Sequence, residues 1–383
     1  MDVLHLITGL GQGGAEQVVY DIATRLDARR CRLAVCSILE PAGERGVFAE
    51  RLRDAGIEVI TLGLGHKWQF RRAARLEGVL RERNPDILHC HLFHANVLGR
   101  RLAARAGVRH VVATVHIAER RWRPWRFWIE RWTDPLGDIT VCVSRAALEF
   151  QSRKTGLPES RFTVIPNGVD TARFAEPGRS RDDVRAALGV PSGARVVGSV
   201  GRLDPQKGYR YLIPAFAELA AEADDLDLVI AGDGPERRRL EALAGRSGCA
   251  GRVHLLGRRE DVPDLLHAFD VFAMPSIYEG FGLTAVEAMA AGVPVVASAV
   301  DSLPEILGAG ERGGRVGRLV PPRRPDKLAE AIGDVLARPP GEQIERARRR
   351  ARQEYDVAKM VERYAELYDS LARQTIDSQP PST

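Results

Sequence analysis

Short apolar runs alternate with longer amphipathic stretches through the first half of the chain. The runs, many of them β-branched, predict strands at residues 3–8, 32–38, 58–62, 87–91, 110–115, 139–143 and 162–165. Apolar positions at helical spacing predict helices between them, for example at residues 15–26 and 95–106. Strands that alternate with helices indicate a parallel sheet with helices on both faces. The alternation pauses at residues 165–180, where proline, glycine and asparagine are typical of a linker.

A second alternating series follows the linker. It predicts strands at residues 195–200, 226–231, 253–256, 271–274 and 293–297, and helices at residues 209–223, 236–243 and 283–291. The sequence therefore predicts an α/β protein of two doubly wound, Rossmann-like domains facing each other across a cleft. We expect the first domain at residues 1–172 and the second at residues 173–355. Residues 356–373 carry an apolar stripe at helical spacing, and residues 374–383 have the composition of a disordered tail.

Composition excludes several classes of protein. Of the 383 residues, 44% are hydrophobic and 28% are charged, which excludes a disordered chain, a collagen-like repeat and a small disulfide scaffold. The five cysteines are scattered and include no C-x-x-C pair, which argues against a zinc cage and favours a reducing compartment. The N-terminus lacks the pattern of a signal peptide, and the longest uncharged apolar stretch, residues 288–300, is shorter than a membrane span. We expect a cytoplasmic protein that can lie on the inner face of the membrane.

The charge is unevenly distributed along the chain. The net charge is +5, but residues 100–131 contain nine arginines and two acidic residues, a net +7. Such a local basic face indicates a local anionic partner and argues against general nucleic-acid binding.

Four of the five tryptophans fall in the same region, between residues 120 and 132. A helix that begins at Pro124 would place Trp125, Trp128, Ile129 and Trp132 on one face. Two interpretations are open: an amphipathic helix at an anionic membrane interface, or an aromatic stripe packed into the domain. We expect a mixture of the two. Trp128 and Trp132 would be largely buried, and Trp122 and Trp125 would lie with the arginines on the acceptor side.

Two glycine-rich turns follow predicted strands. Gly9, Gly11 and Gly14 match a dinucleotide-binding fingerprint, but the second strand does not end on the acidic residue that would hold a ribose. In the second domain a glycine turn carries Arg202 and Lys207, five residues apart. Arginine and lysine side chains in such a turn suit a diphosphate, although two solvated surface cations are the alternative.

Glu279 and Glu287 form the most informative pair of acidic residues. Glu279 lies in a turn between a strand and Gly282, and Glu287 lies about 7.5 Å along the following helix. A phosphate at the helix N-terminus would bring a ribose near Glu287 and a sugar near Glu279. Carboxylates accept hydrogen bonds from vicinal hydroxyls. The alternative is a helix charge at Glu287 and an ordinary loop carboxylate at Glu279.

Taken together, these motifs resemble glycosyltransferase family 4, a retaining, nucleotide-sugar-dependent family of the GT-B fold. The resemblance covers nearly the whole chain and rests on five segments in this order. They are Gly13-Gly-Ala-Glu16, Val164-Ile-Pro-Asn-Gly-Val-Asp170, Gly201-Arg-Leu203 with Lys207-Gly208, Ala231-Gly-Asp-Gly-Pro-Glu236, and Glu279-Gly-Phe-Gly-Leu283 with Glu287. The resemblance also implies that the terminal helix packs back on the N-terminal domain.

The resemblance implies a role for each matching residue. The donor diphosphate would be neutralised by Arg202 and Lys207, Glu287 would bind the ribose, and Glu279 would bind the transferred sugar. Backbone N–H groups would hold sugar and phosphate, at Phe281, Gly282 and Leu283. His116 matches the histidine that contacts donor sugar hydroxyls, and Gly13 and Gly14 would admit donor and acceptor. No metal ion or other cofactor is expected, because the two cations take its place.

One departure leaves the donor sugar open. After the strand at residues 293–297 many relatives carry Gly-Gly before Pro-Glu, whereas here Asp301-Ser-Leu303 stands at that place. His89, His91 and His94 could suggest a metal site, but strand-end packing is the simpler interpretation.

The sequence therefore predicts a retaining glycosyltransferase of EC class 2.4 in surface polysaccharide or glycolipid synthesis. Its expected partners are a nucleotide-sugar donor, a sugar or lipid-linked acceptor and an anionic membrane surface. The alternatives are a nucleotide-sugar epimerase or hydrolase of the same fold, and a non-enzymatic module that binds a lipid surface.

Overall fold

The structure is a computed structural model that describes residues 1–11, 13–41, 43, 46–64, 74–117, 123–311 and 314–377. The chain divides into two units, each with its own parallel sheet. The N-terminal unit comprises Met1–Gly168 and the segment that begins at Val357, and the C-terminal unit comprises Val169–Asp356. The units divide after Gly168 and after Asp356. The sequence had led us to expect boundaries after residues 172 and 355, so they differ by four residues and by one.

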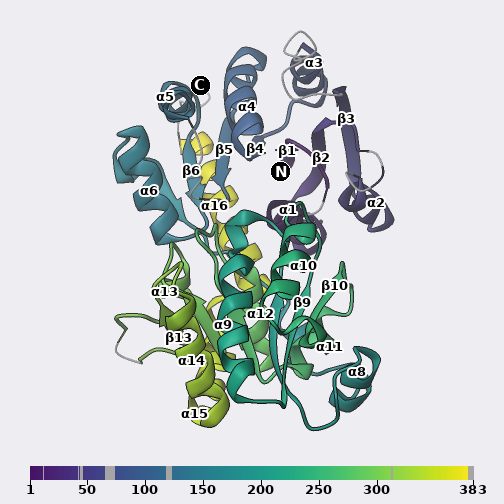
Figure 1. The fold of residues 1–383 in the computed structure, drawn as a ribbon. Helices are drawn as coiled ribbons and strands as arrows, with labels where there is room; N and C mark the ends of the chain where they lie inside the picture. The colour runs from purple at the N-terminus through teal and green to yellow at the C-terminus, as the bar shows by residue number, and fades with distance from the viewer. Residues whose placement is uncertain are drawn as a thin grey trace, which may run out of the picture. The chain divides into compact units, whose positions relative to one another are not determined.

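The N-terminal unit contains seven parallel strands in the order β3-β2-β1-β4-β5-β6-β7 (Figure 1). The strands are β1 (Asp2–Ile7), β2 (Arg32–Leu39), β3 (Glu58–Leu64), β4 (Ile87–His91), β5 (His110–Val115), β6 (Ile139–Cys142) and β7 (Phe162–Val164). The helices are α1 (Gly14–Arg25), α2 (Val47–Asp54), α3 (Ala74–Arg83), α4 (Phe93–Ala106), α5 (Pro124–Thr133), α6 (Arg145–Thr155) and α16 (Val357–Asp377). The strand order reverses between β1 and β4, and ligands of such sheets bind at the carboxyl ends of strands near this point.

The C-terminal unit contains six parallel strands in the order β10-β9-β8-β11-β12-β13. The strands are β8 (Arg195–Val200), β9 (Leu226–Ala231), β10 (Val253–Gly257), β11 (Val271–Met274), β12 (Val295–Ser298) and β13 (Arg318–Val320). The helices are α7 (Thr171–Ala175), α8 (Arg181–Ala187), α9 (Tyr209–Glu222), α10 (Arg237–Arg246), α11 (Val262–Ala268), α12 (Leu283–Ala291), α13 (Leu303–Ile306), α14 (Pro325–Ala337) and α15 (Gly341–Glu354). The order reverses between β8 and β11, which pair directly. Both units are thus doubly wound, as predicted.

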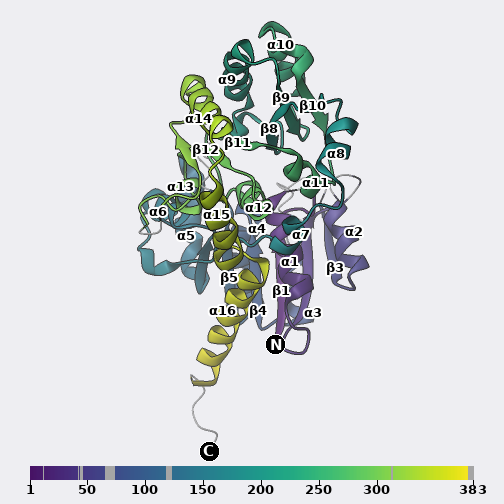
Figure 2. The same ribbon diagram turned by 90° about the horizontal axis from the view of Figure 1, so that it is seen from below.

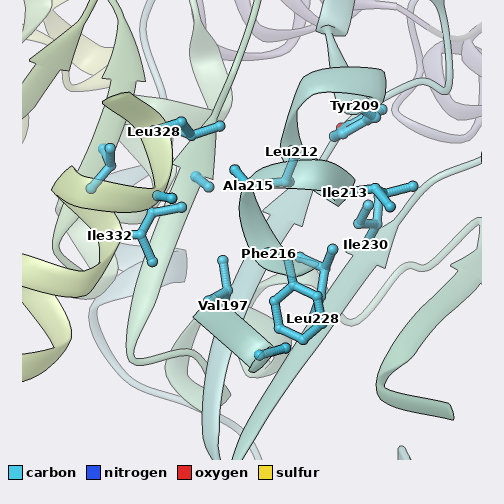
Figure 3. Close-up of a cluster of buried hydrophobic side chains, with 14 of the residues drawn as sticks. Val197, Tyr209, Leu212, Ile213, Ala215, Phe216, Leu228, Ile230, Leu328 and Ile332 are labelled. Carbon is cyan, nitrogen blue, oxygen red and sulfur yellow. The ribbon is translucent and has the colours of Figure 1, made fainter. Parts of the chain in front are cut away.

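A cluster of apolar side chains fills the C-terminal unit on the side of its sheet that α9 and α14 cover (Figure 3). Leu212 and Phe216 of α9 pack with Val197 and Leu228 of the strands and with Ile332 of α14, and all five are fully buried. Burying a large apolar side chain contributes about 1.5–3 kcal/mol, so this cluster fixes the strands from which the site loops extend.

The apolar stripe of α16 is covered by the N-terminal sheet. Met360, Tyr364 and Tyr368 pack with residues of β1, β4, β5 and β6, and with the helix α1. Figure 2 shows the ribbon of α16 running over β4 and β5. The helix continues through Asp377, so residues 374–377 of the expected tail are helical, and residues 378–383 lie outside the described part of the chain. The N-terminal sheet therefore receives its last covering helix from the C-terminal segment.

Candidate active site

The donor-site residues of the sequence analysis follow the two central strands of the C-terminal sheet. Arg202 and Lys207 follow β8, and Glu279 follows β11. Because β8 and β11 are hydrogen-bonded neighbours whose carboxyl ends share one edge, the two loops meet there. The fold thus brings together residues that are more than seventy positions apart.

Close backbone contacts fix the Arg202 loop. Gly201 N–H donates to the carbonyl of Ala231 at 2.9 Å, and Leu203 N–H donates to the carbonyl of Asp233 at 2.9 Å. A Cβ atom on Gly232 would lie 2.0 Å from the carbonyl oxygen of Gly201, and the φ angle of Gly232 is +143°. Only glycine permits that approach, so the Ala231-Gly-Asp-Gly segment holds the loop in place.

The Lys207 loop is joined to the turn after β11. Gly208 has a φ angle of +71°, and a Cβ atom there would lie 2.0 Å from the carbonyl oxygen of Pro275. The backbone N–H of Ile277 donates to the carbonyl of Gln206 at 2.8 Å. The lysine is therefore held against the turn that carries Glu279.

Lys207 and Glu279 form a partly buried ion pair. The Nζ atom of Lys207 donates to Oε2 of Glu279 at 2.8 Å, and the two side chains are 20% and 8% exposed. Ser276 Oγ donates to the same carboxylate at 3.1 Å. The backbone N–H of Glu279 donates to Asp301 Oδ2 at 2.8 Å, so a second carboxylate fixes the turn. The sequence analysis did not assign Ser276 or Asp301 to the site, because neither forms a motif with Glu279.

The helix α12 begins directly after this turn. Gly282 precedes it with a φ angle of +93°, and a Cβ atom there would lie 2.8 Å from Cδ2 of Leu303. The carbonyl of the buried Phe281 accepts a hydrogen bond from Ser302 Oγ at 2.6 Å. The N–H groups of Ala285 and Val286 donate to the carbonyl of Gly282 at 2.9 and 3.4 Å, whereas those of Leu283 and Thr284 have no acceptor within the helix. They form an anion-binding end next to Glu279.

Glu287 lies inside α12 in a desolvated environment. Burial raises the pKa of its carboxyl from 4.5 to about 7, while the nearby cations of Arg173 and Lys207 lower it. Arg173, on α7, is a neighbour that the sequence analysis missed, since it lies three residues beyond the segment at residues 164–170. The side chain of Arg202 is exposed, and among the described residues it makes no hydrogen bond or ion pair. It is a free cation on the loop that also carries Lys207.

The residues expected from the N-terminal unit lie at the ends of β1 and β5. Gly13 precedes α1 and Gly14 begins it, and a Cβ atom on Gly13 would lie 2.6 Å from Oε2 of Glu16. His116 follows β5, and its Nε2 atom is 3.0 Å from His91 Nδ1. Burial lowers the pKa of His116 to about 3, so its imidazole is neutral at physiological pH. Its Nδ1 atom is buried and has no hydrogen-bond partner in the described residues.

The histidines after β4 belong to a buried cluster. His89 and His91 lie with His5 of β1, and their ligand atoms are all within 4.8 Å of one another, whereas His94 is not in this group. Every ring nitrogen of the three histidines has a hydrogen-bond partner among themselves, His116, Thr114 and Tyr368. His5 and Tyr368 were not singled out by the sequence, because only the strand register and α16 bring them here.

The expected burial of Trp128 and Trp132 on α5 is wrong. Trp128 and Trp132 are 64% and 56% exposed, Trp125 is 40% exposed, and Trp122 lies outside the described residues. The rings of Trp128 and Trp132 stack with centroids 6.3 Å apart, and the Arg101 guanidinium lies 5.1 Å from the Trp132 ring centre. The helix thus presents an aromatic and cationic face to solvent.

A buried ion pair explains this orientation. The inward face of α5 carries Phe127, Glu130 and Thr133. Glu130 Oε2 accepts a hydrogen bond from Arg100 Nη1 at 2.7 Å, and both side chains are almost fully buried. Arg100 also donates to Thr140 Oγ1 at 2.7 Å. Because Glu130 must meet Arg100, the opposite face with the tryptophans points outward. No helix in the described ranges is both long and apolar enough to cross a bilayer.

Comparisons with known proteins bear on both units. Residues 12–173 match the family model described as Glycosyltransferase Family 4, and residues 180–354 match the model described as Glycosyl transferases group 1. The alpha-maltose-1-phosphate synthase of Mycolicibacterium smegmatis is 30% identical over 312 residues, which are 74% of this chain and 78% of that protein.

Two further proteins are similar. The UDP-Gal:alpha-D-GlcNAc-diphosphoundecaprenol alpha-1,3-galactosyltransferase of Escherichia coli is 32% identical over 236 residues, 58% of this chain and 60% of that protein. The crystal structure of Anabaena HepE in complex with UDP-glucose aligns with a TM-score of 0.84 and 27% identity, covering 97% of this chain and 100% of that chain. With two doubly wound units in the matching order, the chain belongs to glycosyltransferase family 4 and is a GT-B glycosyltransferase of EC class 2.4.

Proposed function

We propose that the protein transfers a hexose-type sugar from a nucleotide diphosphate sugar to an acceptor hydroxyl, with retention of configuration at the anomeric carbon. The ion pair between Lys207 and Glu279 carries this proposal. A donor whose diphosphate engages Lys207 and whose sugar engages Glu279 replaces one ion pair with two ligand contacts. The resemblance to a retaining family supports retention, and HepE is a similar protein that was crystallised with UDP-glucose.

In the proposed complex each assigned site residue of the C-terminal unit binds one part of the donor. Arg202 and Lys207 neutralise the diphosphate, and the N–H groups of Phe281, Gly282 and Leu283 bind sugar and phosphate. Glu279 accepts hydrogen bonds from the hydroxyls of the transferred sugar. Glu287 lies one helical turn after Leu283 and accepts hydrogen bonds from the ribose.

In the N-terminal unit we assign His116 to a hydroxyl of the donor sugar. Its neutral imidazole presents the unpartnered Nδ1 atom, which suits a hydroxyl better than a charged group. Gly13 and Gly14, at the start of α1, lack side chains that would obstruct donor and acceptor.

During transfer the bond between C1 of the sugar and the diphosphate oxygen breaks, and its electron pair leaves with the diphosphate. A bond between C1 and the acceptor oxygen forms on the same face, and the proton of the acceptor hydroxyl passes to the leaving diphosphate oxygen. Arg202, Lys207 and the N-terminus of α12 stabilise the negative charge that develops on the leaving group. We propose that these groups make a metal ion unnecessary, so that EDTA should leave turnover unchanged.

Thermal shift and calorimetry against a panel of nucleoside diphosphates and their sugars test the donor assignment. The identified donor should be turned over with candidate acceptors, and NMR coupling constants of the product should show the anomeric configuration of the donor. An inverted product would contradict retention. A free sugar or an epimerised nucleotide sugar as the main product would instead identify a hydrolase or an epimerase, and tight vesicle binding without turnover would identify a lipid-binding module.

We further propose that the acceptor is lipid-linked and that the protein acts on the cytoplasmic, anionic face of a membrane, in surface polysaccharide or glycolipid synthesis. The exposed tryptophans of α5, with the arginines around them, suit the headgroup region of an anionic bilayer. The similar Escherichia coli transferase is named for an acceptor on diphosphoundecaprenol.

Flotation with vesicles tests this location. The protein should float with vesicles that contain anionic phosphatidylglycerol and not with neutral phosphatidylcholine vesicles, and high salt should weaken binding because exposed charges are screened over about 8 Å at physiological ionic strength. Trp128→Ala and Trp132→Ala should weaken the association. Failure to float with anionic vesicles at low salt would contradict the proposal.

A further inference from the structure

Buried histidines and a tyrosine of the N-terminal unit form one continuous string of hydrogen bonds, here called the histidine string. Three neighbouring strands, β1, β4 and β5, contribute to it, together with the residue after β5 and with α16. In order, the string consists of His116, His91, His5, Tyr368, His89 and Thr114. All six residues are buried.

The distances along the string are those of hydrogen bonds. His116 Nε2 lies 3.0 Å from His91 Nδ1, and His91 Nε2 lies 2.9 Å from His5 Nδ1. The hydroxyl of Tyr368 lies 3.2 Å from His5 Nε2 and 2.6 Å from His89 Nδ1. The last link, from His89 Nε2 to Oγ1 of Thr114, is 2.7 Å.

The four imidazoles are neutral, because burial lowers their pKa values far below the ordinary value of histidine. A neutral imidazole has one N–H and one lone pair, so every link needs a donor on one side and an acceptor on the other. Only two arrangements satisfy all links and also let the Tyr368 hydroxyl donate its proton within the string. Either all four histidines carry the proton on Nδ1, or all four carry it on Nε2.

The hydroxyl of Tyr368 distinguishes the two arrangements. Bonds donated by an N–H group span about 2.7–3.2 Å and bonds donated by a hydroxyl about 2.5–3.0 Å, so the 2.7 Å link to Thr114 fits either donor, whereas the two links of Tyr368 each fit only one. The short distance to His89 Nδ1 therefore corresponds to the bond that Tyr368 donates, and the longer distance to His5 Nε2 to the bond that it accepts. This direction places the proton on Nε2 of His5, and in consequence on Nε2 of His91 and His116.

The free end of the string is Nδ1 of His116. This atom is buried and lacks a hydrogen-bond partner in the described residues, while the residue as a whole is 9% exposed. With the proton on Nε2, the unpartnered Nδ1 atom is an acceptor. A hydroxyl that donates to it would satisfy the last open position of the string.

We propose that Tyr368 sets the tautomer of His116: acting through His5 and His91, it keeps the proton on Nε2, so that Nδ1 accepts a hydrogen bond from a substrate hydroxyl. This proposal rests on the proposed function, in which His116 contacts the donor sugar. Tyr368 and His5 are positioning residues, since they are fully buried and act through other side chains. A helix at the far end of the chain thus determines which hydrogen bond the site can accept.

A metal ion is the competing explanation for the cluster of His5, His89 and His91. A metal would take the lone pairs that the string uses as acceptors. Elemental analysis of the purified protein distinguishes the two, because a stoichiometric transition metal would overturn the proposal.

NMR of the wild-type protein with 15N-labelled histidine gives the direct test. Protonated and unprotonated imidazole nitrogens resonate in separate 15N ranges, and the signals of His116 are those lost in His116→Gln. We expect a protonated Nε2 and an unprotonated Nδ1 for His116. A proton on Nδ1, or two tautomers in exchange, would overturn the proposal.

Tyr368→Phe tests the role of the hydroxyl, and Tyr364→Phe is the matched control. Tyr364 lies one turn earlier on α16 and is equally buried, and its hydroxyl faces Thr114 at the far end of the string, with no hydrogen bond to any of the four histidines. Tyr368→Phe should give two tautomers of His116 and lower kcat/KM about tenfold, mainly through kcat, as expected for one lost hydrogen bond. Tyr364→Phe should keep one tautomer and the wild-type kcat/KM.

A further measurement separates the two proposals. The affinity for UDP should be unchanged in Tyr368→Phe, because the assigned phosphate contacts lie in the C-terminal unit. A single tautomer and unchanged kinetics in Tyr368→Phe would overturn the role of Tyr368. Absence of nucleotide-sugar turnover by the wild-type protein would instead contradict the proposed function and leave the tautomer measurement valid.

Discussion

The carboxylate of Asp301 accepts a hydrogen bond from the backbone N–H of Glu279 at 2.8 Å. Asp301 has a φ angle of +46°, a conformation that aspartate and asparagine adopt more readily than other residues with a side chain. The segment that replaces the Gly-Gly of many relatives therefore holds the turn of Glu279, the proposed sugar-binding residue, in place. It connects the departure in sequence to the geometry of the donor site.

Asp301→Ala should weaken binding of the donor nucleotide sugar about tenfold and spare the free nucleoside diphosphate. The substitution removes the acceptor that fixes Glu279 and forces alanine into a left-handed conformation, while Arg202 and Lys207 are unaffected. Calorimetry with both ligands measures the difference. Asp301→Asn, which tolerates the same backbone and keeps an acceptor oxygen, is the control, and an equal loss for both ligands in Asp301→Ala would contradict the assignment.

Lys207→Ala should weaken the binding of nucleoside diphosphate about 10- to 100-fold, because a hydrogen bond to a charged group contributes about 1.5–3 kcal/mol. Glu279→Gln should behave oppositely. It releases Lys207 from its ion pair, so the affinity for the free nucleotide should be equal or higher while the affinity for the nucleotide sugar falls. Calorimetric titrations of both variants measure these affinities. The assignment fails if Glu279→Gln weakens the binding of the free nucleotide and of the nucleotide sugar equally.

Glu287→Gln should stabilise the protein above pH 7 and have little effect at pH 5. The folded state raises the pKa of Glu287 from 4.5 to about 7, so between these values the folded protein keeps a proton that the unfolded chain releases. The free energy of unfolding therefore falls as pH rises through this window, and the full cost above pH 7 is about 3 kcal/mol at most. Melting temperatures of both proteins from pH 5 to pH 8 should diverge with pH; a constant difference would refute the desolvation of Glu287.

Glu130→Ala should destabilise the N-terminal unit by about 3–5 kcal/mol, because it leaves the buried Arg100 without its closest carboxylate. Trp128→Ala on the same helix should cost about 1 kcal/mol or less, since the ring is exposed and loses mainly its stacking on Trp132. Urea unfolding of both variants measures the contrast. A larger loss of unfolding free energy for Trp128→Ala than for Glu130→Ala would show that the tryptophan face of α5 is packed against the protein and not exposed.

The sequence predicted most of the fold because buried parallel strands have a strong apolar signal. Five strands, β4, β5, β8, β9 and β11, have the predicted bounds. The strand β13 was missed, since three residues at the sheet edge give no periodicity. The predicted strand at residues 293–297 began two residues before β12, because Val293 and Pro294 lie in the loop that leads into it.

The site was predictable only where its residues form local motifs. Lys207 and Glu279 each follow a strand and stand among glycines, so both were singled out, but their ion pair was not, because it depends on the pairing of β8 with β11. The orientation of α5 could not, because it depends on Arg100, thirty residues before its partner Glu130. The histidine string was equally hidden, since Tyr368 reaches it from a helix that the sequence places far from β1.

The division of the N-terminal unit between the two ends of the chain affects its synthesis. Until Val357 and the residues after it leave the ribosome, the apolar side chains of β1, β4, β5 and β6 that α16 covers remain open to solvent. The C-terminal unit, residues 169–356, is continuous and can fold during this time. At about 5–20 residues per second its translation takes roughly 10–40 s. The nascent N-terminal sheet therefore exposes an apolar face over that interval, and truncation before α16 would leave this face uncovered.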